Sequence, residues 1–439
     1  MAVMAKHMPN INFTVYDDDP YIVCSCQSGP LPFYEPDLDE LVESVRGKNL
    51  HFTKDFDKTV SSQFIFVCIN TPLKTSGLGS EQAADLSGWE NAARRIALAS
   101  KGECKIVVES STIPIQTGET MSKVLETIAP FSFEVLNIPS FYRGGSALQS
   151  FESPERVLLG CNDTPSGKVA SAAAKRLLAP WVPPERVVLS CVWSAELAKL
   201  AQNAMIAQRI ASVNSVSALC EKTGADLDEV MKVISTDTRI GAGYLEACPG
   251  IGGSHLLQTV RMLVYLCRHF RLHAVADYWN QVLVMDEYQR ERFSTNIVRT
   301  MGGSIKDKRI AVLGFAYKPN TSEVLQSPAI GLCRSLLLEG ARLAIYDPQV
   351  SDDKIREELP GASMAQLQLC QSAGDAVAGA SAIVLVTAWD ELAGMDMEAA
   401  YAGMARPAYL FDSRGVYDPA KLSAVGFKVY RIGKPRARA

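Results

Sequence analysis

The sequence predicts an α/β protein with two doubly wound parallel-sheet domains, joined by a long central helix and a helical middle region. Three observations lead to this fold class. Short apolar runs alternate with helical stretches in the N-terminal part, the same alternation returns in the C-terminal part, and the region between them keeps a helical period. With 439 residues, 47% of them hydrophobic, the chain is long enough for about three domains with sizeable cores.

The N-terminal part contains three apolar runs that read as buried strands. They are INFTVYD at 11–17, FIFVCINTP at 64–72 and KIVVESST at 105–112, with helical stretches such as WENAARRIALAS between them. This alternation indicates parallel βαβ units. Because ligands of such sheets bind at the carboxyl ends of the strands, the Asn, Thr and Ser residues found there suggest a nucleotide-type pocket.

The middle of the chain reads as one long helix. The stretch at 194–224 keeps a 3.6-residue apolar period for nearly thirty residues until Gly224 ends it. A second strand and helix alternation follows, with RIAVLG, ARLAIYDP, SAIVLVT and AYLFD as strands. We therefore expect an N-terminal domain at 1–190, a central helical domain at 191–303 and a C-terminal α/β domain at 304–439.

Charge and cysteine usage exclude several classes of protein. A net charge of -4 gives no basic field for nucleic acid or an anionic membrane, and no apolar stretch is long enough to span a bilayer. The eleven cysteines have no metal-ligand spacing, which indicates reduced thiols in the cytosol. We expect a cytoplasmic protein that binds no metal, no nucleic acid and no membrane.

Several separate blocks carry a resemblance to a known family. They are LPFYEP at 31–36, RGKNL at 46–50, NTP at 70–72, the long helix, RIG at 239–241, GGS at 252–254, LGFAYKPNT at 313–321 and YDP at 346–348. In these blocks, and in their order over nearly the whole chain, the sequence resembles the UDP-glucose/GDP-mannose dehydrogenase family, especially its animal-type UDP-glucose 6-dehydrogenase branch.

The resemblance implies a fold and a reaction. The two α/β domains would be Rossmann-like, the first binding a dinucleotide and the second a UDP-sugar, while the helical middle would be the dimerisation domain of a homo-oligomer. The family oxidises UDP-glucose to UDP-glucuronate by four electrons, using two NAD.

The resemblance also assigns residues that this chain keeps. Lys199 and Asn203, four residues apart on one helix face, would stabilise an oxyanion and hold a water, although a plain polar stripe would look the same. Thr112 would position the water. The other matched positions would bind the sugar nucleotide (Arg239, Lys318, Arg414, Tyr244, Phe141) or the NAD (Asp17, Thr71). Arg239 would reach the site of a neighbouring subunit, unless it only caps a helix, and Asp17 is otherwise a residue of a solvated turn.

Other positions depart from the family pattern. His255 follows Gly-Gly-Ser where the family has its nucleophilic cysteine, and without that thiol the aldehyde intermediate has no route to a thioester. Ser140 and Gly144 replace two glutamates of the PEFLxEG loop. Gln258 and Thr259 replace a lysine and an aspartate, and Glu246 replaces a lysine. We therefore predict that the chain cannot complete the four-electron oxidation.

The family also places a strand, a GxGYVG turn and most of a helix ahead of the segment that begins here at residue 2. Those glycines let backbone N–H groups approach a pyrophosphate, so NAD binding is in doubt as the sequence is written. A true deletion and a gene record that begins at a later methionine explain this equally well. A true deletion would leave the sheet without its central strand and with unpaired edges.

Three functional interpretations are compatible with this sequence. In the first, the chain is a pseudoenzyme, a degenerate homologue that binds a UDP-sugar or an active dehydrogenase subunit without turnover. In the second, it is a repurposed non-redox enzyme in which His255 acts as a general acid or base; the alternative for His255 is a side chain that only fills the vacated space. In the third, the sequence is an N-terminally truncated record of an NAD-dependent UDP-sugar dehydrogenase that is limited to a two-electron step.

Overall fold

The computed structural model of the chain describes residues 1–102, 104–129 and 131–435. It divides into two compact units. Unit 1 comprises Met1–Gln202 and Arg261–Leu272, and unit 2 comprises Asn203–Val260 and His273–Ala439. Each unit is an α/β body with its own parallel sheet, so the fold class predicted from the sequence is confirmed.

Unit 1 contains two separate sheets within the described residues. The strands β3 (Phe64–Val67), β4 (Lys105–Glu109), β5 (Phe133–Asn137), β6 (Val157–Gly160) and β7 (Val187–Ser190) form one, and β1 (Phe13–Tyr16) and β2 (Leu50–Thr53) form the other. All pairs are parallel except β5 with β6. Both β1 and β3 are therefore edge strands.

Helices cover both faces of the larger sheet in unit 1. Every residue of β4 is buried. Its Val107 packs with α5 (Ser87–Ala99) and α6 (Thr117–Ile128), while its Ile106 and Val108 pack with α8 (Pro165–Leu178). A strand buried on both faces reads as a continuous apolar run, which is why KIVVE was recognisable in the sequence. The remaining helices of unit 1 are α1 (Ala2–His7), α2 (Pro20–Ser28), α3 (Leu38–Val45), α4 (Phe56–Val60), α7 (Ala147–Glu152) and the 3₁₀ turn η1 (Pro184–Arg186).

Unit 2 contains a parallel sheet with one reversal of strand order. The order within the described residues is β10 (Leu367–Leu369), β9 (Arg342–Tyr346), β8 (Arg309–Leu313), β11 (Ala382–Leu385), β12 (Tyr409–Asp412) and β13 (Lys428–Arg431). The order therefore reverses between β8 and β11, where doubly wound sheets bind ligands outside the carboxyl ends of the strands. Its helices are α10 (Leu227–Ser235), α12 (His273–Thr300), α13 (Pro328–Leu338), α14 (Asp352–Glu358), α15 (Ala373–Val377), α16 (Asp390–Ala393), α17 (Met397–Gly403) and α18 (Pro419–Val425).

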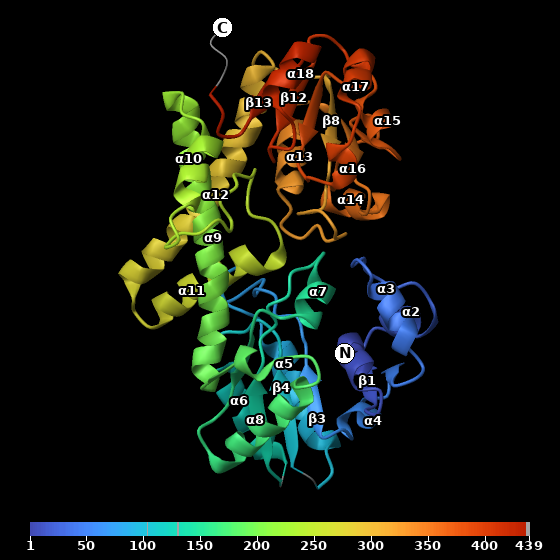
Figure 1. Cartoon of the computed structure of the whole chain (residues 1–439), viewed down its shortest axis with the longest axis vertical. Helices are drawn as coiled ribbons and strands as arrows, with labels where there is room; N and C mark the ends of the chain where they lie inside the picture. The colour runs from blue at the N-terminus through green and yellow to red at the C-terminus, as the bar shows by residue number, and fades with distance from the viewer. Residues whose placement is uncertain (103, 130, 436–439) are drawn as a thin grey trace. The chain divides into compact units, whose positions relative to one another are not determined.

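The central helix predicted from the sequence is α9 (Val192–Thr223), 32 residues long and drawn as one uninterrupted helix in Figure 1. It ends where Gly224 takes a φ of +87°, a conformation that glycine adopts without steric cost. The boundary between the units falls inside α9 and also inside α11 (Ser254–His269). The start of α9 therefore belongs to unit 1 and the rest of it to unit 2.

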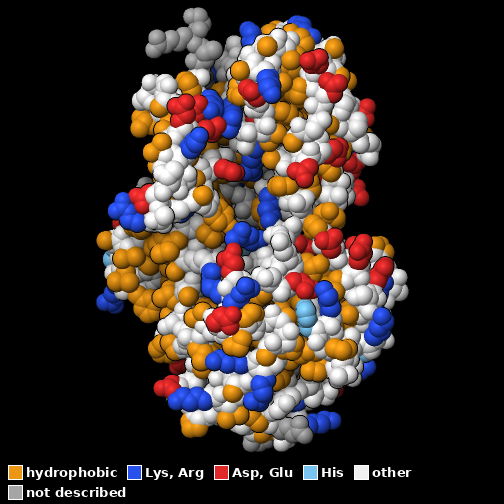
Figure 2. Space-filling view, in the orientation of Figure 1, with side chains coloured by type: hydrophobic (Ala, Val, Ile, Leu, Met, Phe, Trp, Pro, Cys, Tyr) orange, Lys and Arg blue, Asp and Glu red, His pale blue; other side chains and the backbone are white. Residues whose placement is uncertain are grey.

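The surface carries charges of both signs. Lys and Arg side chains are interspersed with Asp and Glu over the face in view (Figure 2). Among the described residues, no helix is both long enough and apolar enough to span a bilayer. The same residues include no cluster of His, Cys, Asp and Glu side chains that could hold a metal ion.

Candidate functional site

Three loops meet at the carboxyl edge of the sheet in unit 2. The guanidinium of Arg414, after β12, donates from Nε to the carbonyl of Val386 at 2.7 Å and from Nη2 to the carbonyl of Tyr317 at 3.4 Å. The Thr387 hydroxyl, after β11, donates to the carbonyl of Ala316 at 2.6 Å. The loops that follow β8, β11 and β12 are therefore held together at the point where the strand order reverses.

Two carboxylates at strand ends fix the shape of this edge. Asp347, after β9, accepts hydrogen bonds from the backbone N–H groups of Phe315 at 2.6 Å and Ala316 at 2.9 Å. Asp412 accepts from the backbone N–H groups of Arg414 and Tyr417 at 3.0 and 2.9 Å. A carboxylate that binds backbone N–H groups rigidifies a loop strongly, because charge-assisted hydrogen bonds are about twice as strong as neutral ones.

Lys318 lies on the loop after β8, with its Nζ 5.8 Å from the centre of the Tyr317 ring. Two of the basic residues predicted to bind the sugar nucleotide, Lys318 and Arg414, thus belong to adjacent loops of one sheet edge. Two cations beside a topological switch point suit a diphosphate.

A glycine-rich loop in unit 2 leads into α11 and is clamped by buried polar side chains. The Asn214 side chain accepts from the backbone N–H of Cys248 at 3.0 Å, and the Gln289 amide donates to the carbonyl of Cys248 at 2.7 Å. Asp286 accepts from the backbone N–H of Ile251 at 2.6 Å and pairs with Arg290 at 2.7 Å. The backbone ahead of α11 is therefore fixed from α9 and α12.

Two predicted site residues, Asn203 and His255, meet Thr259 at the start of α11. The Thr259 hydroxyl donates to the carbonyl of His255 at 2.5 Å, and the Asn203 side-chain amide donates to the Thr259 hydroxyl at 3.3 Å. Asn203 and Thr259 are buried, with 4% and 1% of their surface exposed, while the side chain of His255 is exposed. The Thr259 hydroxyl is therefore engaged within the helix, whereas His255 is exposed.

The remaining predicted residues of unit 2 lie on an exposed segment after α10. Arg239 forms a bidentate ion pair with Asp237, two residues earlier, at 2.6 Å, and 88% of its side chain is exposed. Tyr244 is 41% exposed with a φ of 58°, and Glu246 is exposed. The three side chains are therefore at the surface of the described part of unit 2.

Unit 1 places Lys199 over an aromatic ring. Its Nζ lies 4.9 Å from the centre of the Phe141 ring, and the guanidinium of Arg156 lies 4.8 Å from the same ring. Lys199 is only 8% exposed. Burial, and after it the charge of Arg156, lowers the pKa of Lys199 from 10.5 to about 8. Sequence reasoning proposed Lys199 and Phe141 but missed Arg156, because nothing in the spacing marks it.

The loop at 139–145 carries hydroxyl and backbone groups where the family has carboxylates. The Ser140 hydroxyl donates to the carbonyl of Ser110 at 3.2 Å. The buried Glu35 carboxylate accepts from the backbone N–H groups of Gly145 and Ala147, both at 2.6 Å, so it holds this loop against the start of α7. Glu35 belongs to the block LPFYEP, but its loop-fixing role was not predicted from the sequence.

Two further buried carboxyl groups were also missed. Glu109 ends β4 with no exposed surface, and its Oε2 accepts from the Asn137 amide at 2.8 Å. Burial, and then the nearby Glu196, raises the pKa of Glu109 to about 8. Glu196 accepts from the N–H groups of Gln116 and Gly118 at the start of α6, yet burial still raises its pKa to about 6. For Glu109 the sequence did contain a signal, because a glutamate within the apolar run of a buried strand indicates a buried carboxyl group.

The residues predicted to contact NAD lie at two strand ends of unit 1. Asp17 follows β1 and accepts from the backbone N–H of Asp19 at 2.9 Å, and Asp19 then caps α2. The Thr71 hydroxyl follows β3 and donates to the carbonyl of Thr112 at 2.6 Å. The Asp17 carboxylate fits a ribose hydroxyl, but the described strand ends of unit 1 include no glycine-rich phosphate cradle for the pyrophosphate of NAD.

Three domains of one protein family match successive parts of the chain. The NAD binding domain of the UDP-glucose/GDP-mannose dehydrogenase family matches residues 1–182, the central domain residues 193–288 and the UDP binding domain residues 311–419. The chain belongs to the UDP-glucose/GDP-mannose dehydrogenase family. This confirms the resemblance stated from the sequence.

Individual relatives in the family are similar over nearly their full length. A UDP-glucose 6-dehydrogenase 5 of Oryza sativa subsp. japonica is 43% identical, with 99% of this chain and 94% of the relative aligned. A UDP-glucose 6-dehydrogenase 1 of Arabidopsis thaliana is 42% identical with the same coverage. Among solved structures, a UDP-glucose dehydrogenase of Pyrobaculum islandicum superposes with a TM-score of 0.86 at 26% identity, covering 99% and 94% of the two chains.

Proposed function

We propose that the chain binds a UDP-sugar at the carboxyl edge of the sheet in unit 2 but does not oxidise UDP-glucose to UDP-glucuronate. The binding half is supported by the matched UDP binding domain and by Lys318 and Arg414 on adjacent loops at the switch point. The proposed loss of oxidation rests on the start of α11. There His255 and Thr259 occupy the positions of the family's thiol and carboxylate, and the Thr259 hydroxyl is already hydrogen-bonded within the helix.

The second oxidation requires a nucleophile and a base. In the family a thiolate adds to the aldehyde, and the resulting adduct is oxidised to a thioester that water cleaves. His255 offers no thiol, and the Thr259 hydroxyl donates to a helix carbonyl and has no useful basicity near neutral pH. Ser140 and Gly144 supply no carboxylate either. Both requirements are therefore unmet at the positions that the family uses.

The chain retains groups that bind and polarise. With a pKa of about 8, Lys199 is mostly a cation at pH 7, and its burial strengthens its attraction for an oxyanion. By resemblance to the family, we propose that Lys199 and Thr112 in unit 1 and Asn203 in unit 2 each keep the sugar-positioning role of their matched position. Phe141 in unit 1, and Tyr244 and Arg239 in unit 2, are proposed in the same way to keep their matched roles in binding the sugar nucleotide.

We also propose a homo-oligomer that assembles through α9 in the cytosol. Trp193, Leu197 and Met205 on α9 are 48%, 41% and 60% exposed, and such apolar surface favours a partner helix. All eleven cysteines are free thiols, which supports a reducing compartment.

The test combines binding with turnover. Thermal unfolding is followed with and without UDP-glucose, since a ligand at ~100 times its dissociation constant adds roughly 2.7 kcal/mol of stability. We expect a shift in wild type, its loss in Arg414→Ala, and its retention in Arg342→Ala, which removes an exposed ion pair with Asp307 elsewhere in unit 2. NADH formation is measured in parallel and is expected to be absent.

Two outcomes would change the assignment. Formation of NADH together with UDP-glucuronate would refute the proposal. Formation of NADH without UDP-glucuronate would favour a dehydrogenase that is limited to its first, two-electron step. A shift that survives in Arg414→Ala would move the ligand away from this edge.

A second candidate function is non-redox acid-base chemistry by His255. The observation that favours it is the exposed imidazole at the first turn of α11, behind a glycine loop fixed from two helices. A His255→Ala variant that retains any activity found on a UDP-sugar would remove this candidate.

A further inference from the structure

Two cysteines lie opposite each other just beyond the ends of β6 and β7. The register of these parallel strands pairs Gly160 with Ser190. The backbone N–H of Cys161 then donates to the carbonyl of Ser190 at 3.0 Å, so the ladder continues by one residue and sets Cys161 beside Cys191. Neighbouring strands lie about 4.8 Å apart, within the roughly 4.4–6.8 Å that separates the Cα atoms of a disulfide.

The two thiols belong to the same face of the sheet. Side chains alternate between faces along a strand, and Leu159 is paired with Leu189 two residues earlier. Cys161 and Cys191 therefore share the face of that leucine pair. Cys161 is partly buried beside the apolar cluster under α8, whereas Cys191 is exposed. The Cys191 thiol is thus open to solvent, whereas Cys161 is only partly accessible.

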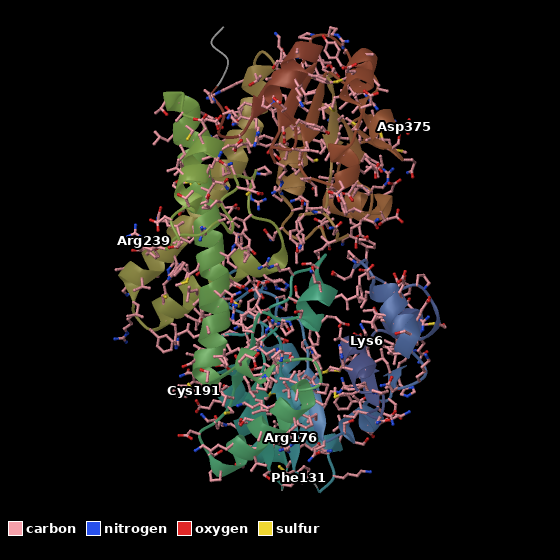
Figure 3. The ribbon with its side chains drawn as sticks, in the orientation of Figure 1. Lys6, Phe131, Arg176, Cys191, Arg239 and Asp375 are labelled. Atoms are coloured by element: carbon pink, nitrogen blue, oxygen red, sulfur yellow. The ribbon has the colours of Figure 1, made fainter. Side chains whose placement is uncertain are left out.

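Cys191 stands at the start of α9, where Figure 3 labels it. Its Sγ lies 3.1 Å from the Ser194 hydroxyl. Hydrogen bonds from the Ser194 side chain and backbone lower the pKa of the Cys191 thiol. The thiolate is the attacking form in disulfide exchange, so this environment favours Cys191 as the first thiol to react.

The strand and the helix around this pair are closely packed. A Cβ built on Gly160 would lie 2.7 Å from Cβ of Ala195 and 3.2 Å from Cα of Val192. The first turn of α9 is therefore seated on the end of β6. Because this contact leaves the two segments little room to separate, we expect the Cys191 Sγ to reach Cys161 by rotation about the Cys191 Cα–Cβ bond.

We propose that Cys161 and Cys191 form a redox-active dithiol that small-molecule disulfides close to an intramolecular disulfide. The Cys191 thiolate attacks one sulfur of the disulfide RSSR, the S–S bond breaks, and RS⁻ leaves and takes up a proton. The Cys161 thiol then loses its proton and attacks the Cys191 sulfur of the mixed disulfide, releasing a second RSH. Two protein thiols are oxidised and one RSSR is reduced to two RSH.

The chain contains an internal comparison. Cys24 and Cys26 are closer in sequence, but they sit two residues apart on α2, where Cys24 is exposed and Cys26 is buried. Positions i and i+2 of a helix do not face each other. Sequence proximity thus predicts reaction at Cys24 and Cys26, whereas strand register predicts reaction at Cys161 and Cys191.

The experiment treats the reduced full-length chain with oxidised glutathione, blocks remaining thiols with an alkylating reagent and maps the peptides by mass spectrometry. We expect a cross-linked pair of peptides that contain Cys161 and Cys191, with loss of two hydrogens from the protein mass. Cys161→Ser should stop at a glutathione adduct on Cys191, and Cys191→Ser should form no cross-link at Cys161. The matched control Cys24→Ser should keep the wild-type cross-link.

The peptide map of the wild-type chain tests the proposal even if a variant folds poorly. The proposal is overturned if Cys191 carries glutathione while Cys161 is still alkylated as a free thiol, or if both remain free. A cross-link from Cys191 to any other cysteine, including one of a second copy, also overturns it.

Discussion

The replacement Lys199→Met is expected to stabilise the protein at neutral pH. The Lys199 pKa is about 8 in the folded chain against an ordinary 10.5. At about 1.4 kcal/mol per pH unit, this difference corresponds to roughly 3 kcal/mol of cost for burying the charge. The contact of the ammonium with the Phe141 ring offsets about 0.5–2 kcal/mol of that cost. A net gain of about 1–3 kcal/mol at pH 7 should therefore follow from the substitution.

The gain should depend on pH with a defined sign. Below pH 8 both the folded and the unfolded chain carry the Lys199 proton, so the full cost is present. Between pH 8 and 10.5 the unfolded chain binds more protons, so the stability of the wild type rises with pH. The advantage of Lys199→Met should therefore shrink by roughly 2 kcal/mol between pH 7 and about pH 9.5.

Urea unfolding followed by circular dichroism and tryptophan fluorescence measures both effects. Lys105→Met is the matched control, because Lys105 is also buried but donates to the carbonyls of Ser61 and Ser62 at 3.3 and 3.1 Å. That variant should lose stability, since it leaves two carbonyls without a donor. A Lys199→Met variant that is destabilised at pH 7, or whose effect is the same at both pH values, would refute the reasoning.

Three further predictions follow from buried groups. Because the pKa of Glu109 is raised to about 8 in the folded chain, the wild type should lose stability as pH rises from 4.5 through about 8. Glu109→Gln should not show this loss, so the thermal midpoints of the two proteins should cross within that range. Midpoints that stay parallel with pH would contradict the raised pKa. Arg292→Leu breaks a largely buried 3.1 Å pair with Glu221 and should cost about 3–5 kcal/mol in urea unfolding, and a cost below about 1 kcal/mol would show that the pair is solvated. Gly314→Ala should cost several times as much as Gly361→Ala, since both have φ near +87° but only at Gly314 would a Cβ collide with Thr387 in the loop after β11. Equal costs would make the steric contact irrelevant.

The features predicted best from the sequence were those set by periodicity. The apolar period at 194–224 gave α9 to within two residues at its start, with Gly224 just past its end. The continuous apolar run of β4 was recognisable because both faces of that strand are covered. These signals depend on which face of an element is buried, and a single sequence records that directly.

The residues that hold the site together were not predictable in this way. Asn214 and Gln289 are 75 residues apart in sequence, yet both bind the backbone around Cys248. A buried polar residue on a long helix looks the same in sequence whether it binds a loop, a ligand or a water. Arg156 escaped notice for a related reason, because its effect on Lys199 passes through space across the Phe141 ring.

The proposed division between retained binding and lost chemistry has a structural basis. Asp347 and Asp412 hold the ligand edge of unit 2 by accepting from backbone N–H groups, and Asn214 and Asp286 hold the glycine loop in the same way. None of these bonds uses the side chain at position 255. The reactive side chain there can therefore change without loosening the loops that shape the binding edge. The proposed UDP-sugar binding without oxidation requires such an arrangement, in which the reactive side chain is replaced while the loops keep their conformation.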